Sequence, residues 1–172
     1  MKQAQLFSSF RRAIVPGISY HQLALTTLIG TYLLMILGAY TSAIGAGLAC
    51  PDWPACYGTL VPFLHPEIIA SSPYSGLQIF AEWAHRTLAV IIGLLIVSTA
   101  FTAWYTRDSA LVRGPAVFAA LLLPFQVILG GLTVTASLAP IVVTSHLATA
   151  TLILIALTAT TVASWPSIVI TH

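Results

Sequence analysis

The stretch IFAEWAHRTLAVIIGLLIVSTAFTAW, residues 79–104, decides the fold, because it is long and apolar enough to cross a membrane as one helix. About 20 mostly apolar residues are needed to cross the hydrocarbon core of a bilayer in helical form. Three more runs of this kind cover about residues 23–44, 115–136 and 141–165. Because irregular backbone is not tolerated where it faces lipid, the sequence predicts an all-α protein, an integral membrane four-helix bundle forming one domain over residues 1–172.

The composition also predicts a lipid bilayer as the surroundings of this chain. Hydrophobic residues make up 58% of the sequence and charged residues 6%, whereas soluble domains contain about 25% charged residues. The net charge of +2 is small, and the sequence shows neither a basic aromatic face nor a phosphate-binding glycine loop. We therefore expect no nucleic-acid partner.

The basic residues predict the orientation of the bundle. All but Arg86 flank the spans on one side of the membrane: Lys2, Arg11, Arg12, Arg107 and Arg113. Basic residues are enriched on the cytoplasmic side of membrane proteins. The sequence therefore predicts a multi-pass protein of the cell membrane, plasma or inner, with both termini in the cytoplasm and the loop over residues 45–78 outside.

The external loop contains CPDWPAC, residues 50–56, which holds both cysteines of the chain. Disulfides persist in oxidising compartments, and the two prolines could bring the α-carbons of Cys50 and Cys56 within the roughly 4.4–6.8 Å that a disulfide needs. The pair is interpreted first as a staple that shapes the loop, with a reactive dithiol as the alternative. A zinc site is poorly supported, because His65 and a few carboxylates are the only other ligands nearby.

Two histidines lie at matched depth in spans that both enter from outside. His85 and His146 are each roughly 8–9 Å along the helix axis from the external start of their span. Ionisable residues inside spans are usually functional, and bundle cores are where facing helices supply ligands to a cofactor. The pair therefore predicts bis-histidine ligation of a haem iron; the alternative for either ring is a hydrogen-bonded interior residue.

The segment EWAHR places Glu82, His85 and Arg86 along one helix face. One interpretation is an ion pair between Glu82 and Arg86 that lowers the cost of charge in the membrane. The functional interpretation has Arg86 neutralising a haem propionate, because its planar fork suits a carboxylate. Glu82 would then orient His85 or transfer protons near the substrate.

Four blocks, GLACPDWPACYG, EWAHR, QVILGGLTV and APIVVTSHLATA, together resemble the haem A synthase family of membrane enzymes. The resemblance implies oxidation of haem O to haem A, in which a ring methyl becomes a formyl group through successive hydroxylations. It also implies a catalytic role for Glu82, haem ligation by His85 and His146, and a disulfide between Cys50 and Cys56. Terminal oxidases use the product, so a terminal oxidase or a haem O synthase is an expected partner.

The chain departs from the family pattern in its number of spans. Typical members have eight spans in two similar halves and four histidines, whereas this sequence predicts four spans and two. The resemblance therefore implies a half-size member that acts as a homo-oligomer, with haem b as cofactor and haem O as substrate. The alternative is a non-catalytic subunit that binds haem b and serves electron transfer or assembly in a respiratory complex.

Overall fold

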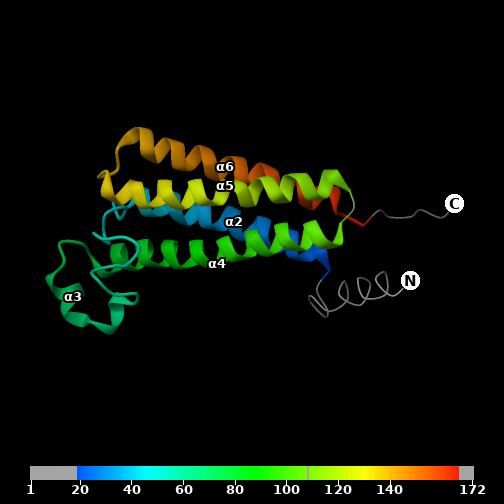
Figure 1. Ribbon diagram of the computed structural model, residues 1–172. Helices are drawn as coiled ribbons and strands as arrows, with labels where there is room; N and C mark the ends of the chain where they lie inside the picture. The colour runs from blue at the N-terminus through cyan, green and yellow to red at the C-terminus, as the bar shows by residue number, and fades with distance from the viewer. Residues whose placement is uncertain (1–18, 108, 167–172) are drawn as a thin grey trace.

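The computed structural model describes residues 19–107 and 109–166. Four long helices run side by side in it: α2 (Tyr20–Ala43), α4 (Gly76–Thr106), α5 (Ala110–Thr135) and α6 (Pro140–Ala163) (Figure 1). All four are long and apolar enough to cross a membrane. The prediction of an all-α membrane four-helix bundle is confirmed. Lys2, Arg11 and Arg12, on which the predicted orientation partly depends, lie outside the described residues.

All four helices begin earlier than the hydrophobic runs indicate, and a local reason can be identified for α4 and α5. The start of α4 is set by a capping box, in which the Ser75 hydroxyl accepts the Gln78 backbone N–H at 3.3 Å and the Gln78 side chain accepts the Ser75 N–H at 3.0 Å. Helix α5 begins before Pro115 and includes the charged Arg113. The guanidinium of Arg113 lies 4.9 Å from the centre of the Trp104 ring. A search of the sequence for uncharged runs ends at a charged residue, so it misses the first turn of α5.

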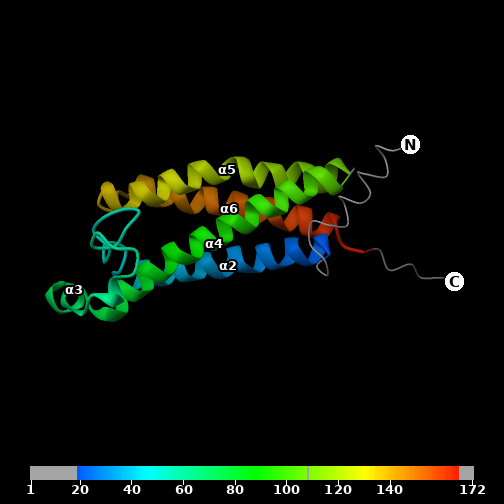
Figure 2. The same ribbon diagram turned by 60° about the horizontal axis from the view of Figure 1, so that its bottom comes forward.

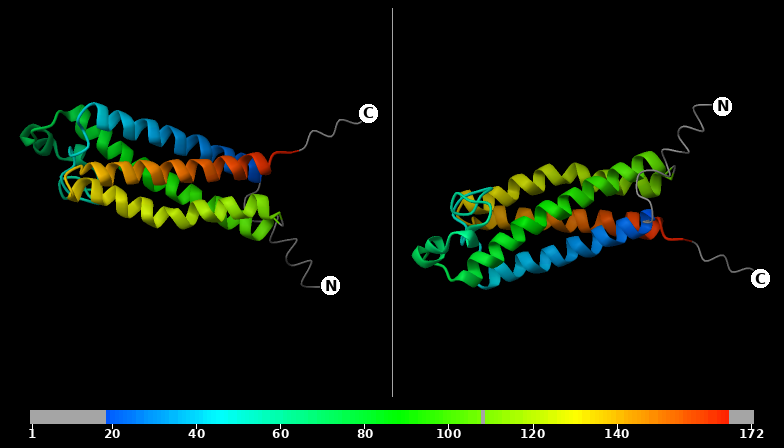
Figure 3. Two further views of the ribbon diagram at one scale, coloured as in Figure 1. Left: turned by 90° about the horizontal axis from the view of Figure 1, so that it is seen from above. Right: turned by 90° about the horizontal axis from the view of Figure 1, so that it is seen from below.

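The packing of the helices places α4 and α6 on one diagonal of the bundle and α2 and α5 on the other. Helix α2 packs against α4 and α6, and α5 packs against the same two. Figures 2 and 3 show the resulting arrangement, with α2 and α4 forming one hairpin and α5 and α6 the other. Side chains that point inward from α4 and α6 therefore meet across the centre of the bundle.

One end of the bundle is closed by small residues and hydroxyl groups. Ala24 and Ala103 are fully buried there, and the Thr160 hydroxyl donates to the Val112 carbonyl at 2.6 Å and lies 3.0 Å from the Tyr20 hydroxyl. Small residues let helices approach closely in lipid, and hydrogen bonds between helices add to their association. This closed end holds the helices together. The candidate functional site lies toward the opposite end of the bundle.

The opposite end carries the segment between α2 and α4. It contains the short 3₁₀ helix η1 (Pro62–Leu64) and α3 (Pro66–Ser71), which lies outside the bundle near the start of α4 (Figure 1). The indole N–H of Trp83 donates to the Leu60 carbonyl at 2.7 Å, and the Phe63 ring packs edge-on against Trp83 with centroids 5.6 Å apart. These contacts fix the segment to α4.

Candidate functional site

His85 and His146 are contributed by α4 and α6, the diagonal pair of helices. Both side chains are partly buried. The Nδ1 atom of each ring is buried and has no hydrogen-bond partner among the described residues. Buried polar atoms are usually paired, so two such nitrogens in one bundle indicate a site for a ligand.

A glycine of the neighbouring helix lies against each imidazole. A Cβ atom added to Gly38 on α2 would lie 2.8 Å from Cε1 of His85, and one added to Gly130 on α5 would lie 3.3 Å from Cε1 of His146. A larger residue at Gly38 would therefore collide with the ring. Each hairpin thus builds its half of the site in the same way, with a glycine from its first helix and a histidine from its second.

The two glycines belong to an internal repeat that the sequence analysis missed. Residues 36–41 and 128–133 both read Ile-Leu-Gly-x-x-Thr. In each copy the threonine donates to the carbonyl of its glycine at 2.7 Å, from Thr41 in α2 and from Thr133 in α5. A comparison of the first helix of each hairpin would have revealed this signal.

Gln126 adds a polar group on the His146 side. Its amide nitrogen lies 3.3 Å from Nε2 of His146, and its carbonyl oxygen is buried without a hydrogen-bond partner in the part of the chain that the structure describes. The sequence analysis used Gln126 only as part of the resemblance. The structure makes it a direct neighbour of a predicted ligand.

This arrangement fits the haem that the resemblance implies. Two imidazoles project from diagonal helices, as ligands on opposite faces of a flat macrocycle require, and glycines rather than larger residues lie beside them. Histidine imidazoles are among the side chains that bind haem iron in proteins. Bis-histidine ligation itself stays a prediction.

Glu82 and Arg86 form the ion pair that the sequence analysis considered. The Arg86 Nε atom donates to Glu82 Oε1 at 2.9 Å, one helical turn away. Glu82 is buried, with 7% of its surface exposed. A buried carboxylate needs such a partner. The roles predicted for Glu82 in catalysis and for Arg86 at a propionate stay predictions.

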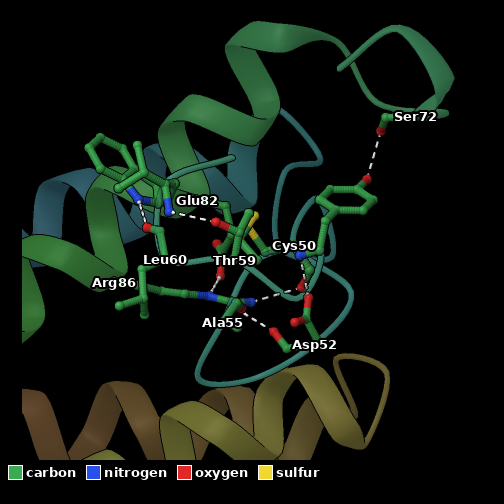
Figure 4. Close-up of a disulfide and its surroundings, with 12 residues drawn as sticks. Cys50, Asp52, Ala55, Thr59, Leu60, Ser72, Glu82 and Arg86 are labelled. Atoms are coloured by element: carbon green, nitrogen blue, oxygen red, sulfur yellow. Dashed lines mark hydrogen bonds and ion pairs between the residues drawn. A yellow bond between two sulfur atoms is a disulfide. The ribbon is translucent and has the colours of Figure 1, made fainter. Parts of the chain in front are cut away.

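Arg86 also holds the disulfide loop, residues 50–56. Its Nη1 atom donates to the carbonyls of Asp52 and Ala55, and Nη2 donates to the carbonyl of Cys50 at 2.8 Å (Figure 4). Together with the bond to Glu82, these contacts use four of the five N–H donors of the guanidinium. The loop is therefore wrapped around a side chain that directly follows His85.

The disulfide loop has a defined internal structure. Cys50 and Cys56 form a disulfide with their α-carbons 4.6 Å apart, and both residues are buried. The Asp52 carboxylate accepts the backbone N–H groups of Tyr57 and Gly58, the latter at 2.8 Å, and Gly58 has the positive φ of +73° that glycine adopts without strain. Burial of both sulfurs favours the interpretation as a structural staple over the reactive dithiol.

The tip of the disulfide loop reaches the other hairpin. A Cβ atom added to Gly131 would lie 3.1 Å from the Trp53 ring, so the indole packs directly on α5 next to Gly130. Figure 2 shows the loop between the ends of the two hairpins. The loop thus connects Arg86, beside one histidine, to the glycine pair beside the other, and it covers this end of the candidate site.

Replacing Arg86 by leucine should destabilise the protein strongly. The change removes three hydrogen bonds to the loop and leaves the buried Glu82 without its partner, which typically costs about 3–5 kcal/mol. The midpoint of thermal unfolding, followed by tryptophan fluorescence in detergent, should fall clearly. The control is Arg113→Leu at the opposite end, which removes the stacking of the guanidinium on Trp104. Equal midpoints for the two variants would contradict this role of Arg86.

Comparisons with known proteins identify a family and several relatives of this chain. The family model COX15-CtaA, described as "Cytochrome oxidase assembly protein", matches residues 21–168. A "Heme A synthase" of Shewanella oneidensis is 41% identical over 128 residues, which cover 70% of this chain and 38% of that protein. A "Heme A synthase" of Symbiobacterium thermophilum is 33% identical over 102 residues, covering 59% of this chain and 30% of that one.

A second kind of relative carries a different name. A "Protoheme IX farnesyltransferase" of Halobacterium salinarum is 38% identical over 104 residues, which cover 60% of this chain and 21% of that protein. The chain thus spans well under two thirds of the length of the curated relatives it matches. No solved structure matches the chain.

The family match extends over all four spanning helices, and it includes both histidines and the disulfide loop. Together with the apolar helices, it identifies a multi-pass membrane protein. The chain therefore belongs to the COX15-CtaA family of cytochrome oxidase assembly proteins, the haem A synthase family that its sequence motifs resemble.

Proposed function

We propose that this chain binds haem between His85 and His146 and takes part in the oxidation of haem O to haem A. The observation that carries the proposal is the pair of imidazoles on diagonal helices, each with a glycine of the neighbouring helix against its ring. The two relatives named "Heme A synthase" support the reaction class. Haem O is the proposed substrate and haem b the proposed cofactor.

The residues around the histidines have separate roles in this proposal. When bound, the haem supplies a redox-active iron and, as haem O, the methyl group that is oxidised. His85 and His146 would hold the group. The buried carboxylate of Glu82, on the helix turn before His85, would serve in proton transfer beside the substrate. Arg86 holds Glu82 in place, and its remaining Nη2 donor is the group proposed for a haem propionate.

The second candidate is a haem b subunit without catalytic activity, serving electron transfer or assembly. This candidate accounts for the two histidines as well as the enzyme does, because it needs only the haem site. Glu82 favours the enzyme, because electron transfer does not require a buried carboxylate beside the porphyrin. A homo-oligomer would supply a second haem site, and we propose this state for the enzyme.

The analysis of extracted haems separates the two candidates. The chain is co-expressed with a haem O synthase, and acid-extracted haems are separated by chromatography and identified by mass. We expect hydroxymethyl or formyl haem to accumulate only when the chain is present. The control is Glu67→Gln in the exposed loop, which should form as much product as the wild type. If only haem b and unmodified haem O are recovered, the enzyme proposal is wrong and the haem b subunit remains.

The proposed partners and orientation follow from the same comparisons and from the basic residues. A relative named for farnesyl transfer to protohaem contains a segment similar to this chain, and farnesylated haem is the proposed substrate, so we propose a haem O synthase as a neighbour in the membrane. A terminal oxidase is the proposed recipient of haem A. Arg107 and Arg113 lie at the end of the bundle opposite the disulfide loop, which supports a cytoplasmic side there and an external loop.

A further inference from the structure

We infer that Gln126 makes His146 the exchangeable ligand of the haem site, whereas His85 is the fixed one. The inference rests on the proposed function, because it requires a haem held by both histidines. It concerns a property that a substrate haem needs and a permanent cofactor does not, namely release from one side.

The first observation is the hydrogen bond between Gln126 and His146. The amide nitrogen of Gln126 lies 3.3 Å from Nε2 of the imidazole. An amide nitrogen only donates, so Nε2 accepts through the lone pair that would otherwise bind a metal. If the amide is turned round, its oxygen accepts a proton from Nε2, and the lone pair is again absent. Either way, ligation through Nε2 has to break this bond.

The second observation is the difference between the two hairpins at the matching position. Leu34 lies one helical turn before Gly38, as Gln126 lies one turn before Gly130. The side chains differ, because leucine offers no hydrogen bond that could compete for His85.

The third observation is the anchoring of His85 through the next residue. Arg86 is bonded to three carbonyls of the disulfide loop, so this turn of α4 is tied to a cross-linked segment. A tied helix turn keeps the ring of His85 in one position. The two ligands therefore differ both in anchoring and in the polar competitor, and both differences favour release on the His146 side.

Gln126 and the haem iron compete for Nε2 of His146 because a buried polar group needs a hydrogen-bond partner. Once Nε2 of His146 is bound elsewhere, the amide nitrogen of Gln126 loses its partner, and the amide oxygen already lacks one among the described residues. A buried polar group without a partner is costly. Gln126 therefore favours the return of His146 to its hydrogen bond and shortens the lifetime of the bound group.

Haem transfer to an acceptor tests this inference. The purified chain is loaded with haem b and mixed with excess apomyoglobin, and the rate of transfer is followed by absorption. Gln126→Leu, which copies the other hairpin, should slow the release roughly three- to ten-fold, as expected when one competing hydrogen bond is removed. The absorption spectrum should not change, because both histidines still bind iron. Leu34→Gln should speed the release.

Gln126→Met is a second variant with a side chain of similar length, and it should slow the release in the same way. The control is Thr133→Val, whose hydroxyl bonds only the Gly130 carbonyl and should leave the rate unchanged. Wild-type or faster release from both Gln126 variants, with an unchanged spectrum, would overturn the inference. Failure of the haem site itself has a different signature, namely a haem spectrum that survives the loss of His85 and of His146.

Discussion

Replacing His85 or His146 by alanine should remove the low-spin absorption spectrum that two axial imidazoles give to haem iron. Loss of one histidine leaves the iron bound to a single protein ligand, or to a weaker ligand in place of the missing imidazole. Substitutions of residues that only support metal ligands cost 10–100-fold in affinity, so loss of a ligand should lower the retained haem by at least about ten-fold. The measurement is the absorption spectrum and haem content of each purified variant.

The matched control for these variants is His65→Ala. His65 is an exposed residue of the external segment, where its ring lies 3.3 Å from the Glu67 carboxylate. Its removal should leave the spectrum and the haem content unchanged. The ligand assignment fails if His85→Ala and His146→Ala both retain the wild-type spectrum at the wild-type haem content.

The fold could be predicted from the sequence because the bilayer imposes simple rules. Length and hydrophobicity suffice to find helices in lipid, so the four spans were found without tertiary information. The exact ends could not be found in this way. The start of α4 depends on the exchange of hydrogen bonds between Ser75 and Gln78, and α5 continues through the charged Arg113.

The site was found only in part, because its histidines carry a signal in the sequence and their neighbours do not. Charge or imidazole inside a span is conspicuous, which is why His85 and His146 were selected. Gly38 and Gly130 look like ordinary packing residues until the structure places them against the rings. Gln126 likewise gains its meaning from a contact with α6 that sequence spacing cannot show.

Arg86 shows most clearly what the sequence alone could not supply. The sequence analysis offered two partners for its charge, Glu82 and a haem propionate, and the structure shows the pair with Glu82. The other partners are backbone carbonyls of Cys50, Asp52 and Ala55, more than 30 residues away along the chain. Backbone carbonyls carry no residue-specific signal, so no sequence pattern could indicate them. The contact exists because the disulfide loop folds back over the bundle end.

These contacts link Glu82 to the disulfide loop through one guanidinium. Because Arg86 has several backbone partners besides the carboxylate, loss of the negative charge at Glu82 still leaves Arg86 hydrogen-bonded to the loop. A glutamine at this position keeps a carbonyl oxygen that can accept from Arg86 Nε. The structure should therefore tolerate Glu82→Gln, and its effect on chemistry can be separated from an effect on folding.

Glu82→Gln should retain bound haem and lose product formation. An amide cannot take up a proton as a carboxylate does, and removal of a positioned acid–base group lowers rates by roughly 10²–10⁴-fold. Haem content and spectrum of the purified variant report binding, while chromatography of haems extracted from cells with a haem O source reports product. The exposed Glu67→Gln is the control for loss of one negative charge. Full product formation by Glu82→Gln would exclude a proton-transfer role for Glu82. Loss of haem from that variant would instead make Glu82 part of the binding site, since His85 lies on the next turn of the same helix.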